Sequence, residues 1–198
     1  MVKIIVLDTE TTGLPREKKI GALESNRNWP DLVSICWHIY EDKELQRAEY
    51  HIIRPEGWRI GASSANIHGI DHATALRDGE KLLDVLTLFK NDVANAYVIA
   101  AHNLHFDKNV LFHAYKWRLG IDPRVFWPIE ADFCSAEEAK DEMKLVFPEP
   151  RTPGVYRFPR LDELYQDTFR RPAPVNAHNA ERDVQVLAAI LFERWRIV

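Results

Sequence analysis

Two carboxylates stand two residues apart at the end of a short apolar run near the start of the chain. Residues 4–7 are Ile, Ile, Val and Leu, Asp8 and Glu10 follow them, and Gly13 provides a turn signal. A short apolar run bounded by a turn signal predicts a buried strand. Because side chains alternate across a strand, we expect Asp8 and Glu10 to share one face.

Two ionised carboxylates on a buried strand need compensation. At a separation of a few ångströms they repel by roughly 4 kcal/mol at an effective dielectric constant of about 20. A shared proton, a basic partner or a metal ion would each relieve this repulsion. If a metal binds, an all-oxygen ligand set favours a hard cation such as Mg²⁺ or Mn²⁺. The pair alone is equally compatible with a strand that ends in a polar turn.

A third acidic residue, Asp107, follows a short apolar stretch at residues 97–101 and lies in the first turn of a predicted helix. Ligands of α/β proteins bind at loops that follow the carboxyl ends of strands. Asp107 is therefore a candidate for the same site as the first pair. The alternative is a helix-capping or dipole interaction worth under about 1 kcal/mol.

A fourth acidic residue, Asp183, shares a helix stripe with Val184 and Leu187 and is expected near the buried side of that helix. A carboxylate there needs a partner, because burying an unpaired charge is very costly. His178 precedes it by five residues on a proline-flanked segment. A single histidine is more often a surface or core residue, and only its spacing to Asp183 makes it a candidate.

Strands and helices alternate around these residues, which predicts the α/β class with a mixed sheet. Beyond the opening run, strands are expected at 32–40, 48–54 and 97–101, and helices at 80–93, 106–119, 161–169 and 179–195. Residues 131–144 are expected to form a short strand or turn and then another helix. Residues 61–79 are expected to be less regular. A long polar loop at 15–31 is anchored by Trp29-Pro30, and a proline-dense excursion lies at 147–159.

Composition sets wider limits on the protein. A chain of 198 residues, 46% hydrophobic and 28% charged, fits one globular domain over 1–198. It contains no apolar run near the roughly 18 residues of a membrane span and no signal-peptide pattern, so a cytoplasmic location is expected. Cys36 and Cys134 are expected to be reduced, and without a Cys-x-x-Cys pair zinc is not expected. The net charge of −4 neither supports nor excludes a nucleic-acid partner.

Three segments together resemble the exonuclease motifs of the DEDDh family, within the ribonuclease H-like superfamily. They are Asp-x-Glu-Thr-Thr-Gly-Leu at 8–14, His-Asn-x-x-Phe-Asp at 102–107 and His-x-Ala-x-x-Asp at 178–183. That family includes the proofreading epsilon subunit of bacterial DNA polymerase III, ribonuclease T and oligoribonuclease. Asn-Ile-His-Gly-Ile at 66–70 resembles the family segment over the terminal nucleotide. The tyrosine subclass would have Tyr four residues before Asp183; Asn179 stands there, as in the histidine subclass.

The resemblance implies a ribonuclease H-like fold with a mixed five-stranded sheet flanked by helices. It implies a 3′–5′ exonuclease that releases nucleoside monophosphates from DNA more than from RNA, with two divalent cations, Mg²⁺ or Mn²⁺. In that scheme Asp8 bridges both ions, while Glu10 and Asp183 hold the ion that carries the attacking water. Asp107 supports the second ion, and His178 is the general base.

The resemblance also implies substrate contacts, at Thr9, Thr11, Leu14, His68, Asn103 and Phe106. Thr11 and Leu14 would lie by the terminal sugar and base, and Phe106 would stack on a base, which is worth roughly 1–3 kcal/mol. For Leu14 and Phe106 ordinary packing is the alternative. The expected partner is nucleic acid with a free 3′ end, single-stranded, and a DNA polymerase or replication partner is left open.

Other functions remain compatible with the sequence. One is a catalytically silent nucleic-acid-binding or polymerase-accessory module of the same fold, and another is a ribonuclease H-like endonuclease. A phosphate-binding NTPase is excluded, because the chain has no Gly-rich loop followed by Lys-Ser/Thr. The loops at 15–31 and 145–160 are longer than in compact members of the family, which leaves substrate preference open.

Overall fold

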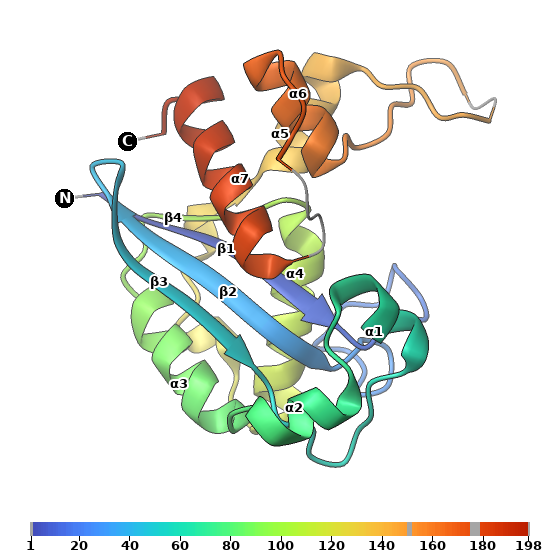
Figure 1. Ribbon diagram of the computed structural model, residues 1–198, viewed down its shortest axis with the longest axis vertical. Helices are drawn as coiled ribbons and strands as arrows, with labels where there is room; N and C mark the ends of the chain where they lie inside the picture. The colour runs from blue at the N-terminus through green and yellow to red at the C-terminus, as the bar shows by residue number, and fades with distance from the viewer. Residues whose placement is uncertain (1, 150–151, 175–178, 198) are drawn as a thin grey trace.

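A computed structural model describes residues 2–149, 152–174 and 179–197 of the chain. Among these residues, five strands form one mixed sheet in the order β3-β2-β1-β4-β5 (Figure 1). Strands β1 (Lys3–Thr11), β2 (Leu32–Glu41) and β3 (Glu44–Ile52) form an antiparallel meander, and β4 (Val98–Ala101) and β5 (Asp132–Cys134) run parallel to β1. The expected mixed five-stranded sheet is confirmed.

The strand expected at 48–54 is shifted toward the N-terminus. Strand β3 begins at Glu44, directly after a turn in which Asp42 and Lys43 have left-handed φ values of 51° and 68°. Its first five residues are exposed and mostly polar, so they carry no apolar signal that a sequence pattern would detect. Hydrogen bonding to β2 imposes the extended conformation on them.

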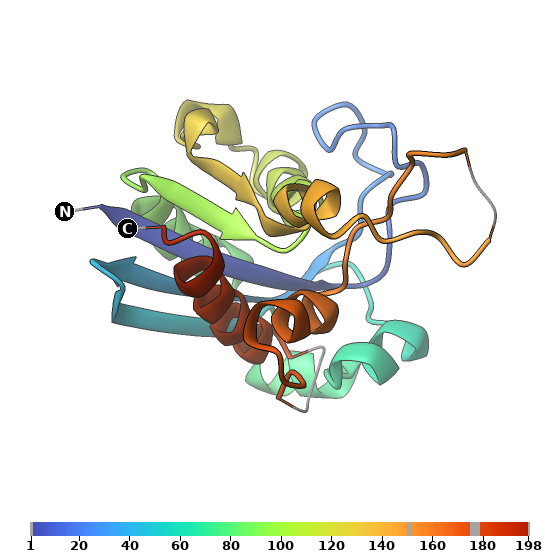
Figure 2. The same cartoon turned by 90° about the horizontal axis from the view of Figure 1, so that it is seen from above.

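Helices cover both faces of the sheet (Figure 2). On one face, α3 (Leu82–Val93) and α4 (Leu104–His113) pack on a core that contains Leu7, Trp37 and Ile99. On the other face, α7 (Ala180–Arg194) packs on the side chains of Ile4, Val6 and Cys36. Alternation along β1 therefore assigns odd-numbered side chains to α3 and α4 and even-numbered side chains to α7.

Two further helices pack against α7. Helices α5 (Ser135–Met143) and α6 (Leu161–Phe169) form a separate small core with α7, centred on Ala139, Leu164 and Ile190. A π-helical turn at Ala114–Arg118 continues α4, and short 3₁₀ turns lie at Pro123–Val125 and Ile129–Ala131. Within the described ranges, no helix has the length and apolar character that crossing a bilayer requires.

The expectation that 61–79 is irregular is wrong, because this segment contains two short helices. Helix α1 (Ala62–His68) ends at Gly69, whose φ of 77° is left-handed. Helix α2 (His72–Asp78) begins after Asp71, whose carboxylate accepts a hydrogen bond from the amide of Thr74. Each helix has only seven residues, too few to show a clear apolar period.

The loop at 15–31 is ordered by side chains at its end. The Asn28 amide donates to the carbonyls of Glu17 and Ile20 at 2.9 Å each, and its oxygen accepts from the Glu17 amide at 2.9 Å. Trp29 is 6% exposed, and its indole nitrogen also donates to the Ile20 carbonyl. The expected anchoring role of Trp29-Pro30 is confirmed.

Replacing Asn28 with Ala is expected to lower the free energy of unfolding by about 2–3 kcal/mol, because three hydrogen bonds of a buried side chain are lost. Urea denaturation measures this loss, and limited proteolysis shows whether the loop becomes cleavable. Asn26→Ala is the matched control, since Asn26 is exposed and only its carbonyl is engaged, by His113. Equal stability of the two variants would contradict the anchoring role.

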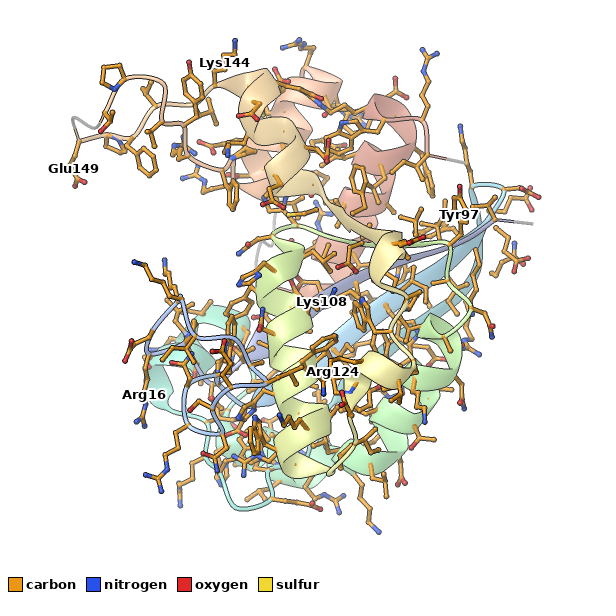
Figure 3. All side chains as sticks on the ribbon, turned by 180° about the vertical axis from the view of Figure 1, so that it is seen from behind. Arg16, Tyr97, Lys108, Arg124, Lys144 and Glu149 are labelled. Atoms are coloured by element: carbon orange, nitrogen blue, oxygen red, sulfur yellow. The ribbon has the colours of Figure 1, made fainter. Side chains whose placement is uncertain are left out.

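A second long connection joins α5 to α6, and we call its described part, residues 145–149 and 152–159, the arm. The Arg157 amide donates to the Leu145 carbonyl at 2.8 Å, so the two sides of the arm pair at its base. Figure 3 shows Lys144 where the arm leaves α5 and Glu149 at its outer end. In Figures 1 and 2 the arm and the loop at 15–31 project from the side of the molecule where β1 ends.

Candidate active site

Asp8 and Glu10 lie where β1 extends beyond its parallel neighbour. Strand β4 pairs with β1 only at Ile4, Ile5 and Val6, so the last residues of β1 have no strand on that edge. On the other edge, Asp8 lies opposite Cys36 and Glu10 opposite Ser34 of β2. Both acidic side chains are half-buried. Strand alternation places them on the face that carries α7.

Asp107 reaches this end of β1 from the first turn of α4. Its side chain is buried, and its Oδ1 accepts hydrogen bonds from the Thr9 amide at 3.0 Å and the Thr9 hydroxyl at 2.7 Å. The carboxylate therefore occupies the edge of β1 that β4 leaves open. One of its oxygens ties α4 to β1.

Asp183 completes the group from the first turn of α7. The helix is capped by the Asn179 side chain, which accepts from the Arg182 amide at 3.2 Å. Asp183 is half-buried and lines a cavity of about 610 Å³ together with Asp8 and His102. Three segments that lie far apart in the sequence thus meet at one end of the sheet.

The carboxylates share one strongly negative environment. Burial raises the pKa of Asp8 well above its usual value, and the other three carboxylates add to the rise. Burial, followed by the charges of Asp183 and Asp107, raises the pKa of Glu10 to about 8. Burial raises the pKa of Asp107 to about 7, against the hydrogen bonds from Thr9. Among the described residues, Asp8, Glu10 and Asp107 take part in no ion pair.

The donor chemistry fits a hard divalent cation, since the side chains offer only oxygen. Within the described part of the chain, no three or more His, Cys, Asp and Glu side chains are arranged as a complete metal site. Mutual repulsion favours such separation of the carboxylates until a cation draws them together. His178, the predicted general base, lies outside the described residues, and its role stays a prediction.

Thr9 and Thr11, two predicted substrate contacts on β1, use their hydroxyl groups in hydrogen bonds within the protein. The Thr9 hydroxyl is engaged with Asp107, and the Thr11 hydroxyl donates to the Gly13 carbonyl at 2.7 Å, holding the turn after β1. Leu14 follows that turn and is 74% exposed. Of these three side chains, Leu14 is the one whose surface is open to a ligand.

The other predicted contacts surround the same end of the sheet. His68 ends α1, accepts from the Ile70 amide at 3.2 Å, and has a buried Nε2 without a described hydrogen-bond partner. Asn103 precedes α4 in a left-handed conformation. Phe106 is half-buried, with its ring 5.9 Å from that of Trp29, so packing already engages part of its surface.

His102 is the first residue of the motif at 102–107 and was not among the predicted site residues. Its side chain holds the cavity wall to two other segments of the chain. Its Nε2 lies 2.9 Å from the Pro159 carbonyl, which can only accept, so this nitrogen carries the proton. Its Nδ1 then accepts from the Ser135 hydroxyl at 2.9 Å. Burial lowers the pKa of His102, consistent with a neutral ring. The imidazole thus joins the end of β4 to α5 and to the base of the arm.

No family model and no curated protein sequence matches the chain. Solved structures do match. Exonuclease X bound to duplex DNA with a 5′ overhang is 23% identical, with a TM-score of 0.58 over 96% of this chain and 89% of its own. A zinc-bound complex of Escherichia coli Exonuclease I with single-stranded DNA is 18% identical, with a TM-score of 0.71 over 99% and 41%. The chain has the ribonuclease H-like exonuclease fold.

Exonuclease I from Methylocaldum szegediense superposes equally well, with a TM-score of 0.71 at 17% identity over 99% of this chain and 41% of its own. The chain thus spans about two fifths of the Exonuclease I chains and most of Exonuclease X. At these low sequence identities, the match shows that the chain shares the fold of these exonucleases. The four carboxylates lie where that fold ends its first strand.

The exonuclease fold also brings two residues to Glu10 that sequence reasoning missed. Ser34 lies opposite Glu10 on β2, and its hydroxyl is fully buried. Burial raises the pKa of Tyr50 of β3, against a side-chain hydrogen bond with Ser34, and the charge of Glu10 adds to the rise. Ser34 and Tyr50 thus place two hydroxyl groups near the Glu10 carboxylate. Finding Ser34 from the sequence would have required the β1–β2 register.

Replacing Thr9 with Val is expected to raise the pKa of Asp107 further, since the hydroxyl hydrogen bond favours the ionised form. The free energy of unfolding should fall by about 1 kcal/mol. Carboxyl-detected NMR titration measures the pKa. Thr9→Ser keeps the hydroxyl and is the matched control. An unchanged Asp107 titration in the valine variant would contradict the assigned hydrogen bond.

Proposed function

We propose that the chain is a metal-dependent 3′–5′ exonuclease, formed as one catalytic domain over residues 1–198. The observation that carries this proposal is the meeting of Asp8, Glu10, Asp107 and Asp183, from three segments, at one end of an exonuclease-fold sheet. Four neighbouring carboxylates repel one another, and burial disfavours their charged forms. Divalent cations bound among them would offset this repulsion, which supports a cation-dependent reaction.

Asp8, Glu10, Asp107 and Asp183 would hold two divalent cations, Mg²⁺ or Mn²⁺. Bound divalent cations lower the pKa of a coordinated water and stabilise negative charge on the leaving oxygen. The chain's own contribution is positioning. Thr9 fixes Asp107, the β1–β2 pairing fixes Asp8 and Glu10, and the capped start of α7 fixes Asp183.

The substrate we propose is a DNA strand with a free 3′ end. Exonuclease X and Exonuclease I, whose fold the chain shares, are seen in complex with DNA. In this proposal Leu14, His68, Asn103 and Phe106 would hold the terminal nucleotide; the exposure of the Leu14 side chain supports its part in this. A polymerase partner and a cytoplasmic location are further proposals.

A 5′-labelled single-stranded oligonucleotide, incubated with Mg²⁺ or Mn²⁺ and with EDTA as the control, tests the proposal. Stepwise shortening from the 3′ end with release of mononucleotides is expected only with the cation. Internal fragments would indicate an endonuclease, and binding without cleavage would indicate a catalytically silent module. Duplex DNA and RNA of the same sequence, tested in parallel, rank the substrates.

His178→Ala is expected to lower the turnover number by about 100- to 10,000-fold, the usual contribution of a general base, because histidine accepts a proton near neutral pH. Binding of Mn²⁺, measured by calorimetry, should change little, since His178 is not among the proposed ligands. His72→Ala, on α2, is the matched control. Near-normal turnover of the His178 variant would refute the base assignment.

A further inference from the structure

The base of the arm lies against the proposed active site. Arg160, the residue before α6, lines the same 610 Å³ cavity as Asp8 and Asp183. Pro159 is buried, and its carbonyl accepts the hydrogen bond from His102 at 2.9 Å. Arg160 therefore has a fixed backbone position next to the carboxylates.

Phe158 and Arg160 flank the buried proline on an extended segment. Arg160 has φ −75° and ψ 161°. These angles are those of the polyproline II conformation. Two residues of chain span at most about 7 Å, so Phe158 lies close to the cavity-lining Arg160. Phe158 is 39% exposed, and the Lys140 ammonium lies 5.9 Å from its ring centroid. An exposed aromatic ring with a cationic neighbour thus lies within two residues of the cavity.

The Arg160 guanidinium keeps donors for a ligand. Its side chain is 72% exposed, and its Nε and Nη2 donate to the Asp162 carboxylate at 3.1 and 3.4 Å. Nη1 donates to no described residue. Nη2 also lies 3.7 Å from the Glu163 carboxylate. Asp162 and Glu163 therefore orient the group from one side, while Nη1 offers two N–H donors to a phosphate oxygen.

We propose that Phe158 and Arg160 form a subsite for the nucleotides upstream of the scissile bond, with Phe158 stacking on a base and Arg160 binding a backbone phosphate. This inference rests on the proposed function and names the part of the substrate that the arm contacts. The occupant is the single strand whose 3′ end lies among the carboxylates. Two observations favour this occupant. Arg160 lines the cavity that contains Asp8 and Asp183, and the positive charges of Arg160 and Lys140 complement phosphates.

The side chains can be changed without removing the local structure. The hydrogen bond at the start of α6 runs from the Arg160 backbone amide to the Glu163 carboxylate at 2.8 Å, so Arg160→Gln retains it. Phe158 is exposed and outside the cores, so Phe158→Ala leaves no buried cavity. Thermal unfolding of each variant should match that of the parent protein.

Two substrates separate the subsite from the catalytic centre. Thymidine 5′-monophosphate p-nitrophenyl ester fills only the centre, whereas a twelve-nucleotide oligothymidylate also reaches the arm. Each variant is expected to lower kcat/KM for the oligonucleotide about tenfold, through KM, because one stacked base or one phosphate contact is lost. The loss on the ester should be much smaller than the loss on the oligonucleotide. Arg160→Lys should recover part of the loss, since it keeps the charge.

Binding of fluorescein-labelled oligothymidylate with Ca²⁺, measured by anisotropy, tests the subsite without catalysis. The Phe158 and Arg160 variants should bind about tenfold more weakly, and the Arg160 effect should shrink with added salt. Tyr97→Ala, at the opposite end of the sheet, and Arg170→Gln, at the other end of α6, are matched controls and should bind normally. Parent-like binding by both test variants, or equal losses on the ester, would overturn the subsite. A parent protein that binds but never cleaves would refute only the exonuclease proposal.

Discussion

Asp8→Asn is expected to lower the rate of oligonucleotide hydrolysis by at least about 1,000-fold, while the protein remains folded. A shared divalent-cation ligand at the centre of the site supports several kcal/mol of charge stabilisation, and each 1.36 kcal/mol is tenfold in rate. Asparagine has the shape of the native residue but lacks its charge. The measurement is single-turnover hydrolysis of a 5′-labelled strand at saturating Mg²⁺.

The same substitution should raise the thermal midpoint of the cation-free protein. Burial and three neighbouring carboxylates disfavour the charge of Asp8, so removing it relieves repulsion. Asp78→Asn is the matched control, because Asp78 is exposed and pairs with Arg77 outside the site. An inactive variant with a lowered midpoint would mean that the loss reflects misfolding rather than missing chemistry.

Cation-free protein is expected to lose stability as the pH rises from about 4 to about 8. The folded-state pKa of Glu10 is raised to about 8 and that of Asp107 to about 7, above their ordinary values near 4. In that window the folded state binds more protons than the unfolded state, so the free energy of unfolding falls with increasing pH. Below about pH 4 these two carboxyl groups are protonated in both the folded and the unfolded state, so they no longer make the free energy of unfolding depend on pH.

Divalent cations should reverse this loss, because they bind the ionised carboxylates of the folded protein. We expect saturating Mn²⁺ to raise the thermal midpoint by at least about 5 °C at pH 8 and by much less at pH 5, a change of a few kcal/mol at this chain length. Differential scanning fluorimetry across pH, with and without Mn²⁺, measures both effects. Glu10→Gln should flatten the pH dependence. A Mn²⁺ effect of equal size at both pH values would contradict the assigned site.

Much of the fold was predictable because its signals are local. The apolar run before Asp8 predicted β1, and helical spacing predicted α3 and α7 to within two residues. The motif resemblance then implied the sheet and the group of acids, and the structure brings Asp8, Glu10, Asp107 and Asp183 together. Their roles in catalysis stay predictions.

Features that depend on pairing between distant segments were not predictable. Ser34 is placed beside Glu10 only by the β1–β2 register. The hydrogen bond from the Thr9 amide to Asp107 depends on the early end of β4, which leaves that amide free of a strand partner. The role of His102 depends on Ser135 and on Pro159, which lies 57 residues away. No local pattern encodes these contacts.

Strand β1 extends beyond β4, and this gives Asp107 a structural role that Asp8 lacks. Asp107 replaces a missing strand by bonding the Thr9 amide, so even a descendant without enzymatic activity would have a structural reason to keep it. Asp8 destabilises the cation-free fold, so selection for stability alone would not retain it. Under the proposed function, an acid at position 8 would therefore be a better marker of activity than one at position 107.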